Sequence, residues 1–151
     1  MGCYNGSMFI AEQLDSIEKQ TYQNWCLYAS DDGSTDETID ILKAYQFRWG
    51  SDRLVIFQGP RKGFCINFLT MASDPSIVTD YYAFCDQDDV WLPGKLSAAI
   101  QCLSSKDSSV ANIYGGRTTY TDINLKKIGV SPNYAFPPSF RNAIVQCIVG
   151  G

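Results

Sequence analysis

The chain has 151 residues, 45% of them hydrophobic and 19% charged, which is enough for one globular domain with a sizeable core and too little for a second complete domain. Its formal charge of −4 argues against a nucleic-acid partner, because contact with a phosphate backbone needs a basic excess. The absence of histidine excludes Ser-His-Asp and Cys-His catalytic sites and histidine-ligated zinc, so carboxylates or thiolates have to hold any metal.

Cysteine spacing and hydropathy predict a cytoplasmic protein. The cysteines occur singly, with no Cys-x-x-Cys pair, at Cys3, Cys26, Cys65, Cys85, Cys102 and Cys147. Free, buried thiols in a reducing compartment are the simplest interpretation. No run reaches the roughly 20 apolar residues of a membrane span, and the N-terminus lacks the layout of a signal peptide.

In the first part of the chain, helical and strand patterns alternate. Residues 7–20 carry a helical stripe of apolar residues, with acidic and amide residues on the other face. Residues 25–30 resemble a short strand that stops at a polar turn, Asp31-Asp32-Gly33-Ser34. Ser34 or Thr35 is expected to cap the next helix, which has acidic residues in its first turn.

The alternation continues to about residue 103 and then changes. The patterns predict strands over 53–58 and 81–85 and helices over 63–71 and 93–103; one or two strands over 110–120, a loop over 124–138 and an apolar run over 143–149 then follow. Strands that alternate with helices at this spacing predict a parallel sheet covered by helices, an α/β layered domain.

Two acidic clusters follow predicted strands. Asp31-Asp32 comes after residues 25–30, and Asp86-Gln87-Asp88-Asp89 comes after residues 81–85. Ligands bind at the carboxyl ends of the strands in open α/β sheets, so one cleft could receive both clusters. No lysine or arginine is close to either cluster in the sequence, and crowded carboxylates repel unless a divalent cation joins them. Mg²⁺ or Mn²⁺ fits, because both ions prefer oxygen ligands.

Structural interpretations of the same residues stay open. The first cluster could equally cap a helix, whereas three carboxylates in four residues exceed what a cap requires. Tyr4-Asn5-Gly6 in isolation is an ordinary turn. It also precedes the first predicted helix, where the tyrosine ring could stack on a base and helix-end amides could face a phosphate.

An ordered set of motifs resembles the family 2 glycosyltransferases. The set comprises Tyr4-Asn5-Gly6, Gln20-Thr21-Tyr22, Asp31-Asp32-Gly33-Ser34-Thr35-Asp36, Gly63 with Asn67-Phe68, and Cys85-Asp86-Gln87-Asp88-Asp89-Val90-Trp91-Leu92-Pro93 with Lys95-Leu96. The resemblance extends from Gly2 to Leu96. Asn142 and Gly150-Gly151 resemble a later family segment more loosely.

The resemblance implies a GT-A, Rossmann-like fold with a nucleotide-sugar site. Tyr4 would stack on a uracil- or thymine-type base and Asp32 would accept its imide proton, while Asp86 would face the ribose. Asp88 and Asp86 would hold Mn²⁺ or Mg²⁺ at the diphosphate, with Asp89 as a helper. The whole set implied for the nucleotide sugar is Tyr4, Asn5, Asp31, Asp32, Gly63, Asn67, Asp86 and Gln87.

The function implied is that of an inverting, metal-assisted glycosyltransferase of the hexosyltransferase type. It would move a sugar from a UDP- or dTDP-sugar to a growing surface polysaccharide or a lipid-linked acceptor, in the cytoplasm or at the inner face of the membrane. A bound cation would stabilise the charge that builds on the leaving diphosphate. A homodimer stays open. A non-catalytic nucleotide-sugar-binding module, an inactive fragment and a plain α/β core are the alternatives.

The chain departs from the family pattern at both ends, so a single domain, incomplete at each end, is expected. The family has an apolar strand before Tyr-Asn-Gly, whereas only Met1-Gly2-Cys3 precedes Tyr4 here. Either that strand is lost or another segment or chain replaces it. The family's catalytic base lies well beyond its Asp-x-Asp motif, so no base is assigned, and Asp122 is a poor candidate.

Overall fold

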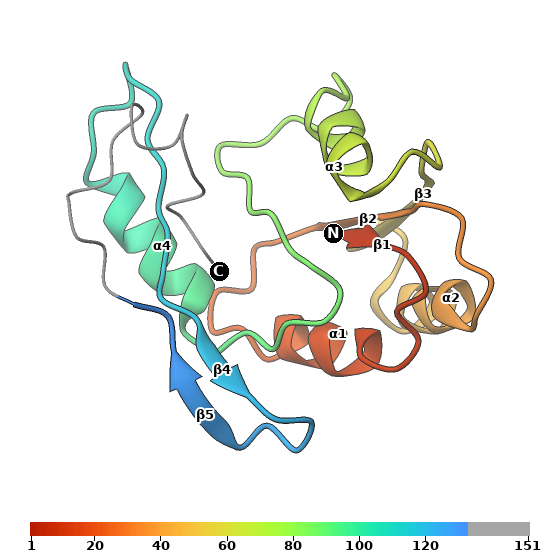
Figure 1. The fold of residues 1–151 in the computed structure, drawn as a ribbon. Coiled ribbons are helices and arrows are strands. Elements are labelled where there is room, and N and C mark those ends of the chain that lie inside the picture. The colour runs from red at the N-terminus through yellow and green to blue at the C-terminus, as the bar shows by residue number, and fades with distance from the viewer. Residues whose placement is uncertain (133–151) are drawn as a thin grey trace. The chain divides into compact units, whose positions relative to one another are not determined.

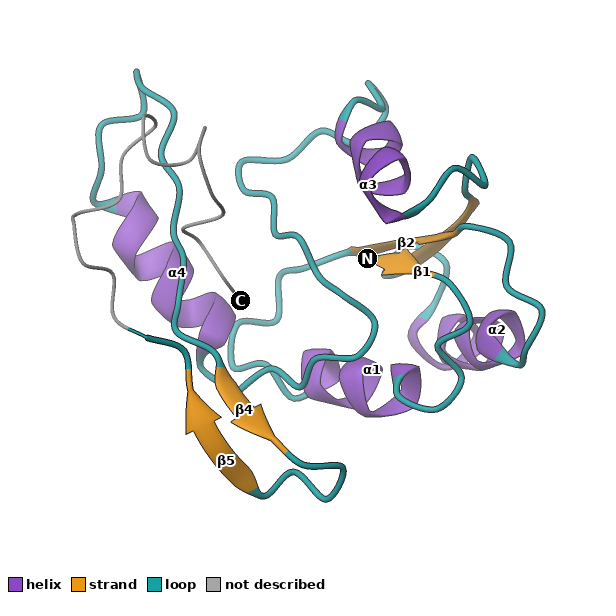
Figure 2. Ribbon diagram, in the orientation of Figure 1, coloured by secondary structure: helices purple, strands orange, loops and turns teal. Residues whose placement is uncertain are grey.

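A parallel sheet with its helices comes first in the chain, and an antiparallel pair of strands comes last (Figures 1 and 2). The computed structural model describes residues 1–132. The chain divides into two compact units, Met1–Ala98 and Ala99–Gly151. The α/β class predicted from the alternation of patterns is confirmed in the first unit.

The sheet of the first unit has the order β1-β2-β3, and both pairs are parallel. Its strands are β1 (Gly2–Cys3), β2 (Leu27–Asp31) and β3 (Leu54–Gln58). The predicted strands at 25–30 and 53–58 are therefore confirmed, with small shifts at their ends. The two residues of β1 pair with Ser30 and Asp31, so a short first strand is present at the carboxyl end of β2.

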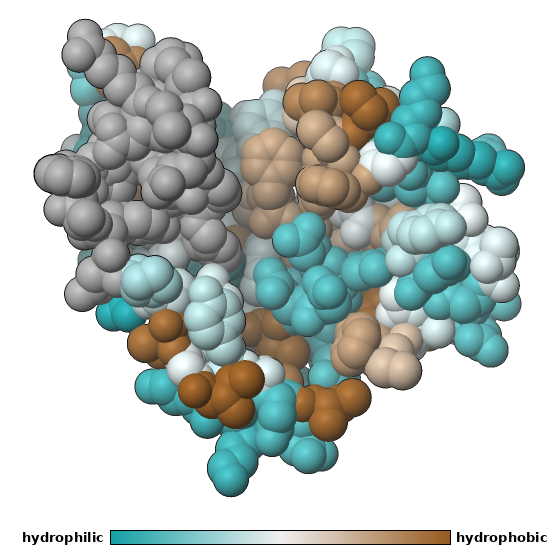
Figure 3. All heavy atoms as spheres, in the orientation of Figure 1, coloured by the Kyte–Doolittle hydropathy of each residue, from teal (hydrophilic) through white to brown (hydrophobic). Residues whose placement is uncertain are grey.

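Helices cover both faces of this sheet. Figure 1 shows α1 (Ile10–Glu18) and α2 (Thr38–Trp49) on one face and α3 (Phe64–Ala72) on the other. The core lies mainly under α1 and α2, and its completely buried side chains include Ile10, Leu14, Ala29, Leu42 and Leu54. Burying each of the larger side chains contributes about 1.5–3 kcal/mol. α3 leaves most of its apolar residues exposed, and Figure 3 shows apolar side chains on the surface over it.

The α1 helix differs from its predicted amphipathic pattern. Leu14 and Ile17 are buried as expected, but Phe9 is 38% exposed. Two amide side chains that the pattern placed on the outer face, Gln13 and Gln20, are buried at 0% and 1% exposure. Periodicity alone treats an amide as a solvent-facing residue, whereas a buried amide is stable when its hydrogen bonds are satisfied.

The predicted cap of α2 was wrong. The helix begins at Thr38, after Ser34 and Thr35, and it is Asp36 that accepts the Thr38 N–H at 3.1 Å. The Ser34 hydroxyl instead donates to the Asp31 carboxylate. Asx-type bonds to a neighbouring backbone N–H compete with helical pairing, which delays the start of the helix.

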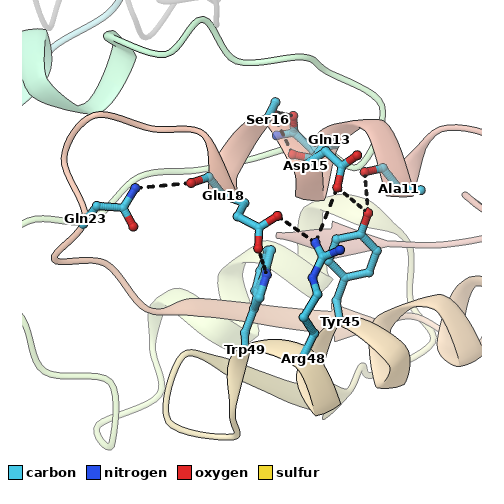
Figure 4. Close-up of polar contacts among 9 residues, drawn as sticks. All are labelled: Ala11, Gln13, Asp15, Ser16, Glu18, Gln23, Tyr45, Arg48 and Trp49. Carbon is cyan, nitrogen blue, oxygen red and sulfur yellow. Dashed lines mark hydrogen bonds and ion pairs between the residues drawn. The ribbon is translucent and has the colours of Figure 1, made fainter.

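A polar network joins α1 to α2 (Figure 4). The Arg48 guanidinium lies 2.8 Å from the Glu18 carboxylate and 3.5 Å from that of Asp15. The Tyr45 hydroxyl donates to Asp15 at 2.7 Å and the Trp49 indole donates to Glu18 at 2.8 Å. The hydrogen bond from Tyr45 lowers the pKa of Asp15, so this carboxylate stays charged and holds the helices together.

The predicted strand over residues 81–85 was wrong, because this segment has no regular secondary structure. A strand needs a neighbouring strand edge for its backbone hydrogen bonds, and β1 offers only Gly2–Cys3. Cys85 is nevertheless buried, at 4% exposure. The following helix, α4 (Lys95–Ser104), begins two residues later than the pattern predicted.

In the second unit, β4 (Thr119–Thr121) pairs with β5 (Lys127–Val130) in an antiparallel hairpin. Of the residues predicted as strands over 110–120, only the last two lie in a strand, β4. The loop predicted over 124–138 was wrong in part, because it contains β5. The Asp122 carboxylate shapes the turn, because it accepts the N–H of Asn124 and that of Lys126, each at 2.9 Å. Residues 133–138, the 143–149 run, Asn142, Cys147 and Gly150-Gly151 lie outside the described residues.

The described cysteines are all free, as predicted, but their burial varies. Cys3 and Cys85 are buried, whereas Cys26, Cys65 and Cys102 are exposed, contrary to the expectation of buried thiols. Burial raises the pKa of the Cys3 thiol to about 12 and that of Cys85 to about 11. None of the helices in residues 1–132 has the length and apolar character that crossing a membrane requires.

Candidate functional site

A cavity of about 800 Å³ opens at the carboxyl ends of β1 and β2 in the first unit. This is the edge at which open α/β sheets bind ligands. The cavity brings together the N-terminal loop, the two acidic clusters and the start of α3. Its lining residues are Gly2, Cys3, Tyr4, Asp32, Gly33, Arg61, Gly63, Phe64, Asn67, Phe68, Asp86, Gln87 and Asp88.

The cavity unites most of the residues that the sequence assigned to a nucleotide sugar. Tyr4, Asp32, Gly63, Asn67, Asp86, Gln87 and Asp88 all line it. Asn5 and Asp31 do not line it. The expectation that both acidic clusters reach one cleft is therefore confirmed through Asp32 and through Asp86 with Asp88.

Asp31 is held inside its own turn. Its carboxylate accepts the N–H of Gly33 at 3.0 Å and that of Ser34 at 2.9 Å, and it also receives the Ser34 hydroxyl. The side chain is buried at 6% exposure. The turn interpretation of Asp31-Asp32-Gly33-Ser34 is therefore correct for its first residue.

Asp32 connects β2 to the loop that follows β3. One carboxylate oxygen accepts the Arg61 N–H at 2.6 Å, and the other accepts the Gly63 N–H at 2.7 Å. Gly63 has φ 86° and Arg61 has φ 58°, so this loop turns sharply around the carboxylate. Asp32 thereby fixes the cavity wall while lining the cavity itself.

The N-terminal loop uses its backbone N–H groups internally. The four successive donors from Tyr4 to Ser7 bond, in order, to the side chains of Gln87, Ser34, Thr38 and Asp36, at 2.8–3.0 Å. These four loop amides are therefore not free to bind a phosphate, because side-chain oxygens already accept their hydrogens.

Asn5 holds the same loop from the other direction. Its side-chain oxygen accepts the Thr35 N–H at 2.8 Å, and its backbone has φ 47°. Asparagine tolerates this left-handed conformation better than most residues. Asn5 therefore shapes the loop that carries Tyr4, whose ring is 57% exposed beside the cavity.

Gln87 connects this loop to the second acidic cluster. Its side chain accepts the Tyr4 N–H at 2.9 Å and donates to the Tyr4 carbonyl, also at 2.9 Å. A Cβ on Gly6 would overlap the Gln87 amide, so any larger residue at position 6 would have to displace that side chain. The residue between the two carboxylates thus fixes their place relative to the tyrosine.

Asp86 and Asp88 are exposed and face the cavity. Within residues 1–132, neither carboxylate takes part in a hydrogen bond or an ion pair. Burial raises the pKa of the neighbouring Asp89, and the charges of Asp86 and Asp88 raise it further, whereas Lys95 opposes the shift. The ammonium of Lys95 lies 4.8 Å from the Trp91 ring centroid. The second cluster therefore does have a basic neighbour, contrary to the sequence-based expectation.

The donor set suits a divalent cation that is shared with a phosphate ligand. In the described part of the chain, no group of three or more Asp, Glu, Cys or His side chains could hold a metal by itself. Mg²⁺ and similar cations, however, commonly bind through one or two carboxylates and complete their shell with water and substrate phosphates. Asp86 and Asp88 offer two such carboxylates at the wall of one cavity.

Asn67 attaches α3 to the end of β2. Its amide donates to the Ser30 carbonyl at 2.8 Å, and its oxygen accepts the Ser30 hydroxyl at 2.6 Å. A Cβ on Gly59 would lie 2.7 Å from that same oxygen, so the approach is close. Both polar atoms of Asn67 are thus occupied at the back of the cavity.

Sequence reasoning missed one cationic residue of the cavity, Arg61. Its side chain packs over Gly33, where a Cβ would lie 3.1 Å from Nε, and it is the only Lys or Arg among the lining residues. Arg61 follows a Gly-Pro break and lies far from both acidic clusters in the sequence. Its φ of 58° cannot be read from the sequence, so no pattern indicated its position.

The chain is similar in sequence to known proteins. A family model described as "Glycosyl transferase family 2" matches residues 1–147. The chain is 37% identical to the dTDP-rhamnosyl transferase RfbG of Shigella flexneri over 68% of the chain and 36% of that protein. It is 31% identical to the UDP-Glc:alpha-D-GlcNAc-diphosphoundecaprenol beta-1,3-glucosyltransferase WfgD of Escherichia coli, over 98% of the chain and 56% of that protein.

A solved structure shares the fold. The crystal structure of S. aureus TarS matches with a TM-score of 0.55 at 23% sequence identity, over 68% of this chain and 18% of TarS. Another relative, the putative glycosyltransferase EpsE of Bacillus subtilis, is 34% identical over 91% of this chain and 48% of EpsE. The chain thus spans only part of the length of each of these proteins.

Proposed function

Because the chain belongs to family 2 of the glycosyltransferases and has their GT-A, Rossmann-like α/β fold, we propose that its cavity binds a UDP- or dTDP-sugar together with Mn²⁺ or Mg²⁺. The observation that carries this proposal is the convergence on one cavity of an exposed tyrosine, the Asp32 carboxylate and two carboxylates that have no partner within residues 1–132. The protein would then take part in inverting transfer of the sugar to a growing surface polysaccharide or a lipid-linked saccharide, at the inner face of the membrane.

The base of the nucleotide would lie between Tyr4 and Asp32. An exposed aromatic ring offers a face for stacking, and Tyr4 is held in place through both polar groups of its backbone. Each oxygen of a carboxylate can accept two hydrogen bonds. Asp32 therefore retains acceptor capacity for the imide N–H of uracil or thymine on the oxygen that binds Gly63, although three backbone N–H groups already bind the carboxylate.

The diphosphate would lie between Arg61 and the Asp86–Asp88 pair. Two carboxylates alone would repel a diphosphate, so a divalent cation on Asp88 and Asp86 is needed to join them. Arg61 supplies a second positive charge on the same cavity, and guanidinium groups bind phosphate oxygens in pairs. Asp86 would also reach the ribose hydroxyls.

The residues of this chain would bind and orient the donor for direct displacement. When bound, the cation supplies electrostatic stabilisation for the charge that develops on the leaving diphosphate. Inversion follows when an acceptor hydroxyl attacks the anomeric carbon from the face opposite the diphosphate. The hydroxyl proton would go to a carboxylate base, and Asp122 is a poor candidate because its carboxylate is occupied in the β4–β5 turn.

The names of two relatives support this choice of nucleotide. RfbG is named for a dTDP sugar and WfgD for a UDP sugar, and both nucleotides carry a base with an imide N–H. WfgD is also named for the acceptor alpha-D-GlcNAc-diphosphoundecaprenol, which is a lipid-linked saccharide. A hexosyltransferase acting in cell-envelope polysaccharide synthesis is consistent with both names.

The experiment that tests the proposal is thermal unfolding with UDP, dTDP and CDP, each with and without Mn²⁺. A ligand that binds only the folded protein raises the melting temperature. UDP and dTDP should stabilise the protein more than CDP, because N3 of cytosine carries no hydrogen for Asp32 to accept. Mn²⁺ should increase the shift with UDP. Equal shifts for UDP and CDP, or no effect of Mn²⁺, would contradict the proposed site; hydrolysis of the donor sugar would separate a transferase from a binding module.

A further inference from the structure

The acidic segment, residues 85–92, forms no helix or strand, yet residues near both of its ends are buried. Cys85 is 4% exposed and Trp91 is 7% exposed, while Asp86 and Asp88 between them are exposed. Three carboxylates in four residues repel one another, and this repulsion favours a more open arrangement. Contacts outside the segment must therefore oppose the repulsion.

The α1 helix supplies these contacts through a row of buried polar side chains. Gln13, Ser16 and Gln20 are at most 5% exposed and lie three and four residues apart, so they share one face of the helix and its end. Each has its polar atoms turned toward the acidic segment or toward the next member of the row.

Gln13 and Ser16 bind the segment on both sides of its carboxylates. The Gln13 amide donates to the Cys85 sulfur, one residue before Asp86. The Ser16 hydroxyl oxygen accepts the Trp91 N–H at 2.9 Å, two residues after Asp89. Ser16 in turn donates to the backbone carbonyl of Gln13 at 2.7 Å, so the two attachments form one network.

Gln20 extends the attachment past the segment. Its amide nitrogen donates to the Leu92 carbonyl at 2.9 Å, and its oxygen accepts the Leu96 N–H at 3.1 Å. The groups that Ser16 and Gln20 bind in Trp91, Leu92 and Leu96 are backbone groups. These bonds therefore fix the path of the main chain itself.

We propose that Gln13, Ser16 and Gln20 are positioning residues that hold the acidic segment where Asp86 and Asp88 can share a metal-bound diphosphate. The inference rests on the proposed metal and nucleotide site. It assigns to α1 a role in donor binding, although α1 lines no part of the cavity. Groups that orient metal ligands without touching the metal commonly change metal affinity about 10–100-fold when they are removed.

The first test replaces Ser16 by alanine and measures the ratio of UDP affinities with and without Mn²⁺. Ser16→Ala removes the acceptor of the Trp91 N–H, so we expect the Mn²⁺-linked gain in affinity to fall about 10-fold or more. UDP affinity without metal should fall less than the Mn²⁺-linked gain, because Gln13, Ser16 and Gln20 form no hydrogen bond with Tyr4 or Asp32 and reach Tyr4 only through Gln87 of the segment. Ser16→Thr keeps the hydroxyl and should restore the gain.

Ser73→Ala is the matched control. The Ser73 hydroxyl also donates to a backbone carbonyl near the end of its own helix, that of Leu69, but Ser73 is exposed and its hydrogen bonds do not reach the acidic segment. Gln13→Met provides a second variant in case Ser16→Ala does not fold, because methionine has a similar volume and suits a buried position. It should reduce the Mn²⁺-linked gain in the same direction.

Hydrogen exchange separates this inference from the proposed function. In Ser16→Ala, amides of residues 85–92 should exchange faster than in the parent, while those of β2 and β3 should not change. Unchanged exchange in the segment, or an unchanged Mn²⁺-linked gain, would overturn the positioning role. A parent protein without any Mn²⁺-linked gain would overturn both the proposed metal site and the functional part of this inference.

Discussion

The side chain of Gln87 binds the backbone of Tyr4 at both polar groups, accepting from its N–H and donating to its carbonyl, each at 2.9 Å. These residues are 83 positions apart in the sequence. The contact mimics the backbone pairing of two strands and joins the tyrosine at the cavity to the residue between Asp86 and Asp88. It makes the geometry of the two halves of the candidate site interdependent.

Gly6→Ala should therefore have the same effect as Gln87→Ala. An alanine Cβ at position 6 would lie 2.2 Å from the Gln87 amide oxygen and would displace it from Tyr4. We expect each variant to lose about 1–2 kcal/mol of unfolding free energy, measured by urea denaturation, and to bind UDP more weakly. The double variant should be no less stable than either single one, because both remove one contact.

Gly94→Ala is the control for this pair. A Cβ at Gly94 would meet no atom of the described residues within 4 Å, so stability and UDP affinity should be those of the parent. Additive losses in the double variant Gly6→Ala with Gln87→Ala would show that the two residues act separately.

Asp88→Ala should abolish the metal-linked part of UDP binding and leave the fold intact. The carboxylate has no hydrogen bond or ion pair within residues 1–132, so its loss leaves no buried partner unsatisfied. Calorimetric titration with UDP, with and without Mn²⁺, measures the effect. Asp40→Ala, at an exposed carboxylate on α2, is the matched control. Retention of the full Mn²⁺ effect in Asp88→Ala would remove Asp88 from the metal site.

Asp32→Asn should weaken metal-free UDP binding and reduce the preference for UDP over CDP. An asparagine side chain has only one acceptor oxygen, and its NH₂ group can donate to N3 of cytosine. We expect the ratio of CDP to UDP dissociation constants to fall about 10-fold or more. The melting temperature should fall as well, because the backbone N–H groups of Arg61 and Gly63 would compete for the single side-chain oxygen of asparagine. An unchanged ratio would exclude Asp32 from the base pocket.

Arg61→Gln should lower affinity for UDP but not for uridine. The guanidinium is expected to contact the diphosphate, which uridine lacks, so the loss should be about 10-fold for UDP in isothermal titrations. The neighbouring Lys62→Gln is the control, because Lys62 does not line the cavity. Equal losses for UDP and uridine would place Arg61 against the base or the ribose instead.

Acid should destabilise the first unit through Asp36. Burial acts to raise the pKa of Asp36, but hydrogen bonds from the Thr38 hydroxyl and the Ser7 N–H outweigh it and hold the pKa well below its usual value. A carboxylate whose pKa is lower in the folded state stabilises the fold at pH above its unfolded pKa of about 4. This stability is lost as the pH falls toward the folded pKa.

Urea unfolding between about pH 7 and pH 3 tests this expectation. Asp36→Asn should be less stable than the parent at neutral pH and should lose less stability on acidification. Asp40→Asn, at an exposed carboxylate, should follow the pH dependence of the parent. Parallel curves for Asp36→Asn and the parent would show that Asp36 is not the group responsible.

Local patterns in the sequence determined the α/β class, most helices, β2, β3 and the residues that meet at the cavity. Periodicity and capping signals act over a few residues, so they indicate elements such as α1 and β2 without knowledge of the fold. The rule that parallel strands end at one edge predicted that Asp32 would meet Asp86 and Asp88, and they do line one cavity, although residues 81–85 form no strand.

Tertiary structure decided which polar side chains build the site and which would bind a ligand. The polar side-chain atoms of Asp31 and Asn67 and the side-chain oxygen of Asn5 are occupied by the protein itself, whereas Asp86 and Asp88 remain unpaired within residues 1–132. The row Gln13, Ser16 and Gln20 is buried against the acidic segment, and residues 81–85 form no strand beside the short β1. A sequence shows which groups can form hydrogen bonds, but partners more than 70 residues away decide which ones do.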